Sequence, residues 1–182
     1  MSLMDTVARP ETRPPIITIA ADAGLGKSTL AATFPNPIVI RAEDGLNRIS
    51  KQVETPMAFP PIKEPSDLWE QLTALMKEEH SYDTLVIDSV TRLDELFIKE
   101  VLDGDKRAKG INQANGGYGN GPAAVAAQHG RVIRFCKALM EKRGMAVVLI
   151  AHADLETMRL PDMDDYQRYS LRMLKQSVPY YI

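Results

Sequence analysis

Short apolar runs alternate along the chain with longer segments in which apolar residues recur every three or four positions. The runs have no polar face, which is typical of strands buried on both sides of a sheet, and they cover residues 15–21, 37–41, 84–88 and 145–151. The segments with helical spacing cover residues 27–33, 66–80, 91–102 and 122–143. Strands that alternate with helices pair in parallel through right-handed crossovers. The pattern therefore predicts an α/β fold, with a mostly parallel central sheet and helices on both faces.

Two stretches interrupt this alternation. Residues 103–121 hold six glycines and three asparagines, a composition that predicts a long loop. Residues 153–165 follow the fourth strand directly and are also expected to form a loop, whereas residues 166–174 alternate at strand spacing and predict a fifth strand. Long loops within one domain usually serve a function. At the start of the second helix, Ser66 is expected to be the N-cap residue.

Length, charge and cysteine content limit the class of protein. The 182 residues suit one domain, which we expect to cover residues 15–182, with residues 1–14 as a disordered or leader segment. The 22 Lys and Arg residues against 24 Asp and Glu residues give a net charge of −2, which excludes a uniformly basic nucleic-acid binder. Cys136 is the single cysteine, no apolar signal core opens the chain, and the longest wholly apolar run covers only residues 145–151. We therefore expect a cytoplasmic protein without a membrane-spanning segment.

Immediately after the first predicted strand, residues 21–28 read ADAGLGKS, which has the spacing of a phosphate-binding P-loop. Gly24 and Gly26 allow backbone N–H groups to turn toward phosphate oxygens, and the next helix adds the partial positive charge of its N-terminus. Lys27 is expected to reach the β- and γ-phosphates, and Ser28 to bind magnesium. Alanine stands where the strict pattern has its first glycine, and a plain glycine turn with an exposed lysine is the alternative. The expected nucleotide-binding residues are Ala23, Gly24, Leu25, Gly26, Lys27, Ser28 and Thr29.

Polar residues at the ends of three other predicted strands can complete such a site. Asp88 ends the strand of residues 84–88 and is expected to hold magnesium as a Walker B aspartate; its alternative role is to cap the next helix. Glu43 is the best candidate for the base that activates water, with Asp44 as its nearest competitor and a solvent-facing acid as the alternative. His152 is expected to sense the γ-phosphate, unless it is a histidine satisfied at a strand end. No Asn-Lys-x-Asp tetrapeptide that reads guanine follows, so ATP with Mg²⁺ is favoured over GTP.

Five segments together, ADAGLGKST, IRAEDGL, TLVIDSVTRL, NGGYGNG and VVLIAHAD, resemble the RecA-like ATPases encoded by bacteriophages and prophages, some of which are single-strand-annealing recombinases. The resemblance covers residues 16–174 and implies a RecA-like P-loop NTPase core with the P-loop strand central. It implies Glu43 as catalytic glutamate, Asp88 as Walker B residue and His152 as sensor.

The same resemblance implies how such a protein works in the cytoplasm of a bacterial host. Identical subunits would form a ring or filament, and a single-strand-binding protein is a further expected partner. A neighbouring subunit would supply a lysine or arginine to the γ-phosphate. The candidates for that cation are Arg168, Arg172 and Lys175.

In RecA relatives two loops face DNA, and by position these would be residues 103–121 and 153–165. Residues 104–143 carry eight basic residues and two acidic ones, a local charge of +6, which suits sequence-independent binding of single-stranded DNA. A solvated helix face beside a loop is the alternative. Residues 153–165 carry five acids and one arginine, which argues against a DNA role there. The expected DNA-binding residues are Lys106, Arg107, Lys109, Tyr118, Arg131 and Arg134.

The sequence therefore favours a Mg²⁺-dependent ATPase that acts on single-stranded DNA in phage recombination, annealing or replication, with hydrolysis stimulated by DNA. Two other functions stay open: a non-catalytic ATP switch that loads a protein partner, and a small-molecule kinase on a P-loop scaffold. Such kinases usually carry an arginine-rich lid, whereas both long loops here are glycine-rich or acidic. The chain ends shortly after the predicted fifth strand, where RecA relatives usually continue, so we expect a truncated C-terminus and an unprotected sheet edge.

Overall fold

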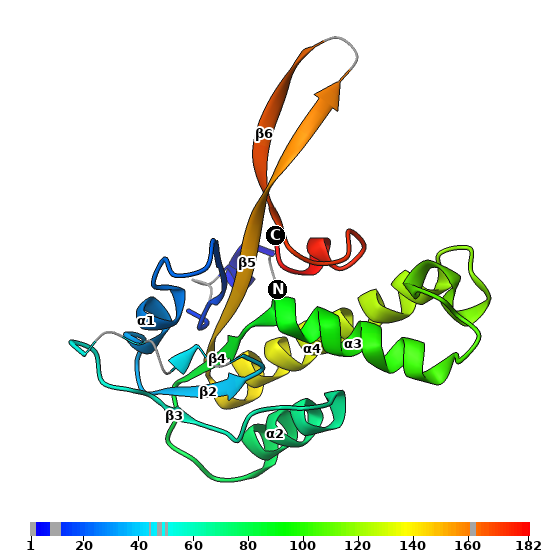
Figure 1. Cartoon of the computed structure of the whole chain (residues 1–182). Helices are drawn as coiled ribbons and strands as arrows, with labels where there is room; N and C mark the ends of the chain where they lie inside the picture. The colour runs from blue at the N-terminus through cyan, green and yellow to red at the C-terminus, as the bar shows by residue number, and fades with distance from the viewer. Residues whose placement is uncertain (1–2, 8–11, 44, 47–48, 50, 161–162) are drawn as a thin grey trace.

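Strands and helices alternate along the chain in the computed structural model, as the apolar pattern predicts (Figure 1). The structure describes residues 3–7, 12–43, 45–46, 49, 51–160 and 163–182. The strands are β1 (Ile16–Ala21), β2 (Pro37–Arg41), β3 (Met57–Ala58), β4 (Thr84–Asp88), β5 (Ala146–Leu160) and β6 (Met163–Leu171). The α-helices are α1 (Lys27–Ala32), α2 (Pro65–Lys77), α3 (Val90–Gly104) and α4 (Asn120–Arg143). Short 3-10 turns form η1 (Leu3–Thr6), η3 (Ile111–Gly116) and η4 (Val178–Tyr180). Across these ranges, no helix has the length and apolar character needed to cross a bilayer.

The parallel strands lie in the order β1-β5-β4-β2-β3. In this order Arg41 of β2 is in register with Asp88 of β4, and Ala21 of β1 is in register with His152 of β5. The predicted mostly parallel sheet is confirmed, and all four strands predicted from apolar runs belong to it. The central position expected for the P-loop strand is wrong. β1 lies at the end of the order, because the other parallel strands all lie to one side of it and β6 pairs with β5 instead.

Helices cover both faces of the sheet, as predicted. Neighbouring residues in a strand point to opposite faces, so each strand contributes to two apolar layers. One layer packs against Ala31 of α1 and contains Val39, Val86, Val148 and Ile150. The other packs beneath α2, α3 and α4 and contains Ile38, Ile40, Leu85, Ile87, Val147 and Leu149. Because side chains alternate between the two faces along a strand, His152, two positions after Ile150, lies on the same α1 side of the sheet.

β5 continues beyond the parallel sheet and pairs with the antiparallel β6. The prediction of a loop over residues 153–165 is therefore wrong, because most of this segment belongs to the two strands of a hairpin that projects from the body of the protein (Figure 1). The strand predicted over residues 166–174 exists, but it begins at Met163 and ends at Leu171. Most described hairpin side chains are exposed on both faces, so no apolar stripe marks the extension of β5 in the sequence.

Two helix boundaries also differ from the prediction. Residues 103–121 do not form one irregular loop, since α3 reaches Gly104, η3 occupies the middle and α4 begins at Asn120. The Asp105 carboxylate organises this connection by accepting hydrogen bonds from the backbone N–H groups of Arg107 at 3.2 Å and Asn115 at 2.9 Å. In α2, Pro65 is already the first helical residue, so Glu64 and not Ser66 is the N-cap.

A buried hydrogen-bond network fastens the C-terminal segment to α3 and α4. The side chain of His129 is fully buried, with Nε2 2.9 Å from Oδ1 of Asp94 and Nδ1 2.6 Å from the hydroxyl of Tyr181. The other oxygen of Asp94 accepts a hydrogen bond from the backbone N–H of Leu174 at 2.9 Å. Because buried polar groups are costly to leave unpaired, this network holds the segment after β6 against the two helices.

Candidate functional site

The P-loop connects β1 to α1 and closes around the ammonium of Lys27. Gly24 and Gly26 have φ angles of 82° and 78°, a left-handed conformation that favours glycine. Nζ of Lys27 donates hydrogen bonds to the carbonyl oxygens of Ala21 at 2.8 Å and Asp22 at 2.7 Å. Lys27 is only 7% exposed, so the alternative of a glycine turn with an exposed lysine is excluded.

Asp88 ends β4 and meets the first turn of α1. Its Oδ2 accepts a hydrogen bond from Oγ of Ser28 at 2.8 Å. Burial raises the pKa of Asp88, although the hydrogen bond from Ser28 opposes the rise. The peptide bond between Asp88 and Ser89 is cis. Asp88 does not cap the next helix, because Ser89 is the N-cap of α3 and its hydroxyl accepts a hydrogen bond from the backbone N–H of Arg92.

Glu43 follows β2 and lies at the same sheet edge. The backbone N–H groups of Ala42 and Glu43 both donate to the carbonyl oxygen of Asp88, at 2.7 and 2.9 Å. Oε2 of the Glu43 side chain accepts hydrogen bonds from Oγ of Ser89 at 3.0 Å and from Nε2 of His152 at 2.9 Å. Burial alone would raise the pKa of Glu43, but these two hydrogen bonds outweigh burial and hold the pKa below its ordinary value. The carboxylate is thus ionised and fixed through one oxygen; within the described ranges no hydrogen bond engages Oε1.

His152 lies where β5 leaves the parallel sheet. Its backbone N–H donates to Oγ1 of Thr91 at 2.9 Å, which ties it to the first turn of α3. Its Nε2 is engaged by Glu43, but its buried Nδ1 has no hydrogen-bond partner among the residues that the structure describes. Buried polar atoms are rarely left unpaired, so this ring is not a histidine fully satisfied at a strand end.

These side chains converge on one cavity of about 230 Å³ at the carboxyl edge of the sheet. Its lining consists of Ala23, Gly24, Gly26, Lys27, Ser28, Thr29, Glu43, Gly45, Asp88 and His152. Of the predicted nucleotide-binding residues, Leu25 alone does not line it, and its side chain is 69% exposed. Asp44, the competitor of Glu43, lies outside the described residues.

Gly45 is a site residue that sequence reasoning missed. A Cβ atom at this position would collide with the carboxylate of Asp88 and lie 2.9 Å from Oγ of Ser28. The residue must therefore be glycine for the chain after β2 to pass over the Ser28–Asp88 pair. Ser89 and Thr91, which hold Glu43 and His152, were also missed. For Gly45, the one signal in the sequence is that a glycine directly follows the acids at positions 43 and 44.

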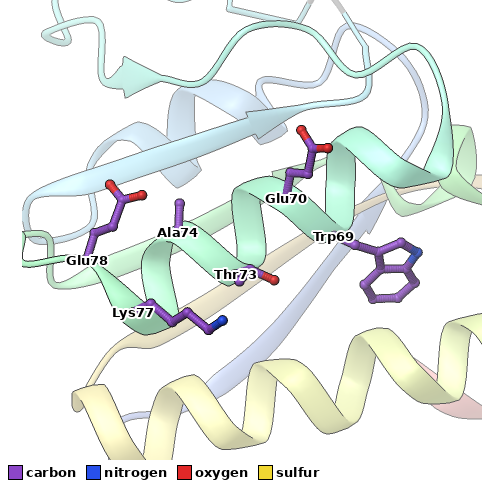
Figure 2. A pocket seen from close by; sticks show the side chains of 6 residues that line it. All are labelled: Trp69, Glu70, Thr73, Ala74, Lys77 and Glu78. Atoms are coloured by element: carbon purple, nitrogen blue, oxygen red, sulfur yellow. The ribbon is translucent and has the colours of Figure 1, made fainter.

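A larger hollow of about 340 Å³ lies elsewhere, along α2 (Figure 2). Figure 2 shows its lining side chains, which all come from α2 and its end: Trp69, Glu70, Thr73, Ala74, Lys77 and Glu78. None of them is a predicted site residue, and no titratable groups converge there from different elements. Among the described residues, the candidate catalytic and metal-binding side chains lie at the P-loop cavity instead.

The predicted DNA-binding residues fall into two groups away from this cavity. Lys106, Arg107 and Lys109 are exposed in the connection between α3 and α4, where Lys106 pairs with Asp103 at 3.6 Å. Tyr118 in the same connection is fully exposed. It lies in a run of five residues with positive φ, from Asn115 at 55° to residue 119 at 84°. A bulky residue such as Tyr118 rarely adopts this backbone, and residues held in such conformations cluster at functional sites.

The second group is the basic stripe of α4. The stripe consists of Arg131, Arg134, Lys137 and Lys142, whereas the apolar residues Val125, Val132, Cys136 and Leu139 of the same helix are fully buried. Arg134 and Lys137 are exposed. Arg131 is exposed as well, and its guanidinium stacks on the ring of Trp69, 3.9 Å from the ring centroid. Both arginines thus lie at the surface, and Arg131 also contacts α2.

The three cations expected to act on a neighbouring subunit are all paired within the chain. Arg168 and Lys175 each lie 3.5 Å from the carboxylate of Glu156. Arg172 makes a two-point contact with Asp154, with Nε 2.8 Å from Oδ2 and an η-nitrogen 2.6 Å from Oδ1. Of these three, Arg172 lies nearest to the cavity, since its backbone N–H donates to the carbonyl oxygen of His152 at 2.9 Å.

The cavity fits a magnesium–triphosphate group. Magnesium binds proteins through one or two oxygen ligands and takes its other ligands from phosphate and water. Ser28 and Asp88 present two oxygens 2.8 Å apart, close to the spacing of roughly 2.9 Å between adjacent ligands of an octahedral Mg²⁺. No cluster of three or more His, Cys, Asp or Glu side chains in the described ranges offers a metal site made by protein alone. The donor set therefore suits a metal shared with a phosphate.

Comparison with known families agrees with this geometry. The family model described as "AAA domain" matches residues 13–180, which is most of the chain and includes every residue that lines the cavity. A search of curated proteins found no match. The extent of the family match, together with a P-loop at the edge of a mostly parallel sheet, shows that the chain belongs to the AAA domain family of P-loop NTPases.

Proposed function

We propose that this protein hydrolyses ATP in a Mg²⁺-dependent reaction at the P-loop cavity. The proposal rests on three kinds of chemical group that line one cavity. These are the ammonium of Lys27, the two oxygens of Ser28 and Asp88 that suit magnesium, and the ionised carboxylate of Glu43. The ammonium and the magnesium oxygens also serve nucleotide binding without hydrolysis. The fixed carboxylate is what distinguishes a hydrolytic site from a simple nucleotide-binding site.

In the proposed reaction, Glu43 acts as general base. A water oxygen forms a bond to the γ-phosphorus, its proton passes to Oε1 of Glu43, and the bond to the bridging oxygen breaks with its electron pair remaining on ADP. Oε2 is held by Ser89 and His152, so Oε1 is the oxygen left to face the water. Magnesium, bound by Ser28 and Asp88, would neutralise charge on the phosphates. Lys27 would exchange its two carbonyl partners for phosphate oxygens.

His152 is proposed to report the state of the γ-phosphate. Its ring binds Glu43, its backbone binds Thr91 of α3, and the strand that carries it continues into the projecting hairpin. A shift of Glu43 on binding or release of the γ-phosphate would therefore reach both α3 and β5. This gives the site a physical connection to two surfaces of the protein.

We further propose that the protein acts on single-stranded DNA through the connection between α3 and α4. Tyr118 supplies an exposed ring for base stacking, and Lys106, Arg107 and Lys109 supply charge for the phosphate backbone. α3 links this surface to the cavity, because its N-cap Ser89 binds Glu43 and the helix ends at the basic connection (Figure 1). The acidic hairpin, which points to another side in Figure 1, is not included in the proposed DNA surface.

The finer biological assignment follows the RecA-like resemblance of the sequence. We propose a role in phage recombination, annealing or replication in the cytoplasm of a bacterial host, carried out by a ring or filament of identical subunits with a single-strand-binding protein as partner. The placement of β2 beside β4, which brings Glu43 to Asp88, supports this relation.

Phosphate release measured with and without single-stranded DNA tests the proposal. The wild-type protein is expected to hydrolyse ATP with Mg²⁺ and to do so faster with DNA, whereas Lys27→Ala should lose both ATP binding and turnover. Lys77→Ala is the matched control, because Lys77 lies at the end of α2 outside the cavity. Turnover that DNA does not change would contradict the DNA role while leaving the ATPase intact. ATP binding without turnover would favour the switch.

A further inference from the structure

We propose that Arg172 is a catalytic arginine that acts on the γ-phosphate of its own subunit, and that Asp154 holds it in reserve when no triphosphate is bound. The inference rests on the proposed ATPase function and names a further residue of the same site. It differs from the expectation that a neighbouring subunit provides the cation. The two assignments make opposite predictions when subunits are mixed.

The strand register places Arg172 beside the cavity. Ala153 pairs with Leu171 in the antiparallel hairpin, so the next pair inward brings Arg172 opposite His152, which the 2.9 Å backbone hydrogen bond between them confirms. Opposite residues of an antiparallel pair have their side chains on the same face. His152 lies on the α1 side of the sheet and binds Glu43. Arg172 therefore lies on the face that carries the P-loop, next to the proposed sensor.

The charge of the cavity calls for a second cation. Among its described lining residues, Lys27 is the one permanent positive charge, against the carboxylates of Glu43 and Asp88. Mg²⁺ and Lys27 leave much of the negative charge of a triphosphate and these two acids unbalanced. Phosphoryl transfer increases the demand, because charge spreads over the oxygens of the transferred group. Arg172, whose backbone contacts His152 of the cavity lining, is a described cation that can supply the missing charge.

Electrostatic effects agree with this placement. Burial lowers the pKa of Lys27, and the positive charge of Arg172 lowers it further, against the effects of nearby carboxylates. The pKa of Arg172 is raised, first by its hydrogen bond and charge pairing with Asp154, and also by the charges of Asp22 and Glu43. Arg172 is thus close enough to interact with both the P-loop and the proposed base.

The contact with Asp154 is suited to hold the Arg172 guanidinium until a phosphate replaces the carboxylate. Two nitrogens of the guanidinium meet the two oxygens of Asp154, the same fork geometry with which arginine binds a phosphate. The side chains are 57% and 50% exposed, and exposed ion pairs of this kind contribute little to stability. A triphosphate in the cavity would offer the guanidinium more negative charge than one carboxylate, and rotation of the side chain would exchange one partner for the other.

Single-turnover hydrolysis of Mg·ATP by the full-length protein tests the inference. Arg172→Ala is expected to bind ATP nearly as well as the wild type and to lower the rate about 100-fold or more, with partial recovery in Arg172→Lys. Arg159→Ala is the matched control, because Arg159 pairs with Asp165 at 3.4 Å in the same hairpin and does not line the cavity. Asp154→Asn keeps the arginine and weakens its competing partner, so it should raise the rate. A loss in Asp154→Asn as large as in Arg172→Ala would overturn the inference, because the ion pair itself would then be what matters.

Mixing variant subunits separates action within one subunit from action on a neighbour. Lys27→Ala subunits cannot use ATP but retain Arg172, so they can rescue Arg172→Ala subunits only if the arginine acts on a neighbour. We expect no rescue at any mixing ratio, and restored turnover would overturn the inference. A wild-type protein without turnover would instead contradict the proposed ATPase function. Wild-type turnover that Arg172→Ala leaves unchanged would contradict the inference alone.

Discussion

Nε2 of His152 lies 2.9 Å from Oε2 of Glu43, although 109 residues separate the two in the chain. The contact joins β5, at the point where it leaves the parallel sheet, to the loop that follows β2, across the carboxyl end of β4. It also leaves only one oxygen of Glu43 for other chemistry.

Removing the histidine should change how turnover depends on pH. The hydrogen bonds from His152 and Ser89 hold the pKa of Glu43 below its ordinary value against the opposite effect of burial. Glu43 is the base only when ionised, so turnover falls as the pH drops through its pKa. In His152→Ala one of the two hydrogen bonds is lost and burial remains, so the pKa of Glu43 rises. We expect the acid limb of the pH–rate profile to move to higher pH, while ATP affinity at neutral pH changes little.

The control for that experiment is His80→Ala. His80 contacts the carbonyl oxygen of Leu75 at the end of α2 and does not line the cavity. Its variant should keep the wild-type profile. An acid limb that stays in place in His152→Ala would show that the histidine does not set the protonation of Glu43.

Gly45→Ala should weaken Mg·ATP binding by about tenfold or more. The new methyl group would collide with Asp88 and press on Ser28, the two residues that present oxygens to magnesium. Gly104→Ala offers a matched control, since a Cβ there meets nothing within 4 Å. Titration with a fluorescent ATP analogue measures both. Equal affinities for the two variants would mean that the chain at position 45 does not approach the metal ligands.

Tyr181→Phe should lower the free energy of unfolding by about 1–3 kcal/mol, because it leaves Nδ1 of the fully buried His129 without its partner. Urea denaturation measures this change. Tyr180→Phe is the neighbouring control: the ring of Tyr180 contacts Gly130, and we expect its variant to stay within about 0.5 kcal/mol of wild type. If both variants change the free energy of unfolding by a similarly small amount, the network does not hold the C-terminal segment in place.

Tyr118→Ala should weaken binding of an unstructured oligonucleotide by about 1–3 kcal/mol, the usual contribution of one stacked base. Tyr166→Ala, at an exposed tyrosine of the hairpin, is the control. Fluorescence anisotropy at two salt concentrations would also show whether the basic connection contributes charge, because phosphate contacts weaken as salt rises. Loss of affinity in Tyr166→Ala with none in Tyr118→Ala would move the DNA site to the hairpin.

The parallel sheet and the P-loop could be predicted because each has a strong local signal. A strand buried on both faces is a continuous apolar run, and the P-loop has fixed spacing between a strand and a helix. Asp88 and His152 followed from the same reasoning, since each ends such a run and parallel strands bring their carboxyl ends to one edge. Their convergence on one cavity is what the topology then produces.

The features that could not be predicted depend on contacts distant in sequence. The extension of β5 has no buried face, so its acids suggested a loop rather than a strand. The edge position of β1 depends on where β6 pairs, which no local pattern reports. Gly45 matters only because Asp88 and Ser28 lie beneath it, and Arg172 comes beside His152 only through the register of the hairpin.

Measuring both ATP binding and ATP turnover in Glu43→Gln shows whether the carboxylate at position 43 activates water. Glutamine keeps the size of the side chain and removes its charge, so the account predicts ATP affinity close to wild type and turnover lower by roughly 10²- to 10⁴-fold. Glu70→Gln, an acid of the hollow along α2, should match the wild type in both. Wild-type turnover in Glu43→Gln would contradict the account, because the carboxylate at the centre of the cavity would then have no part in the reaction.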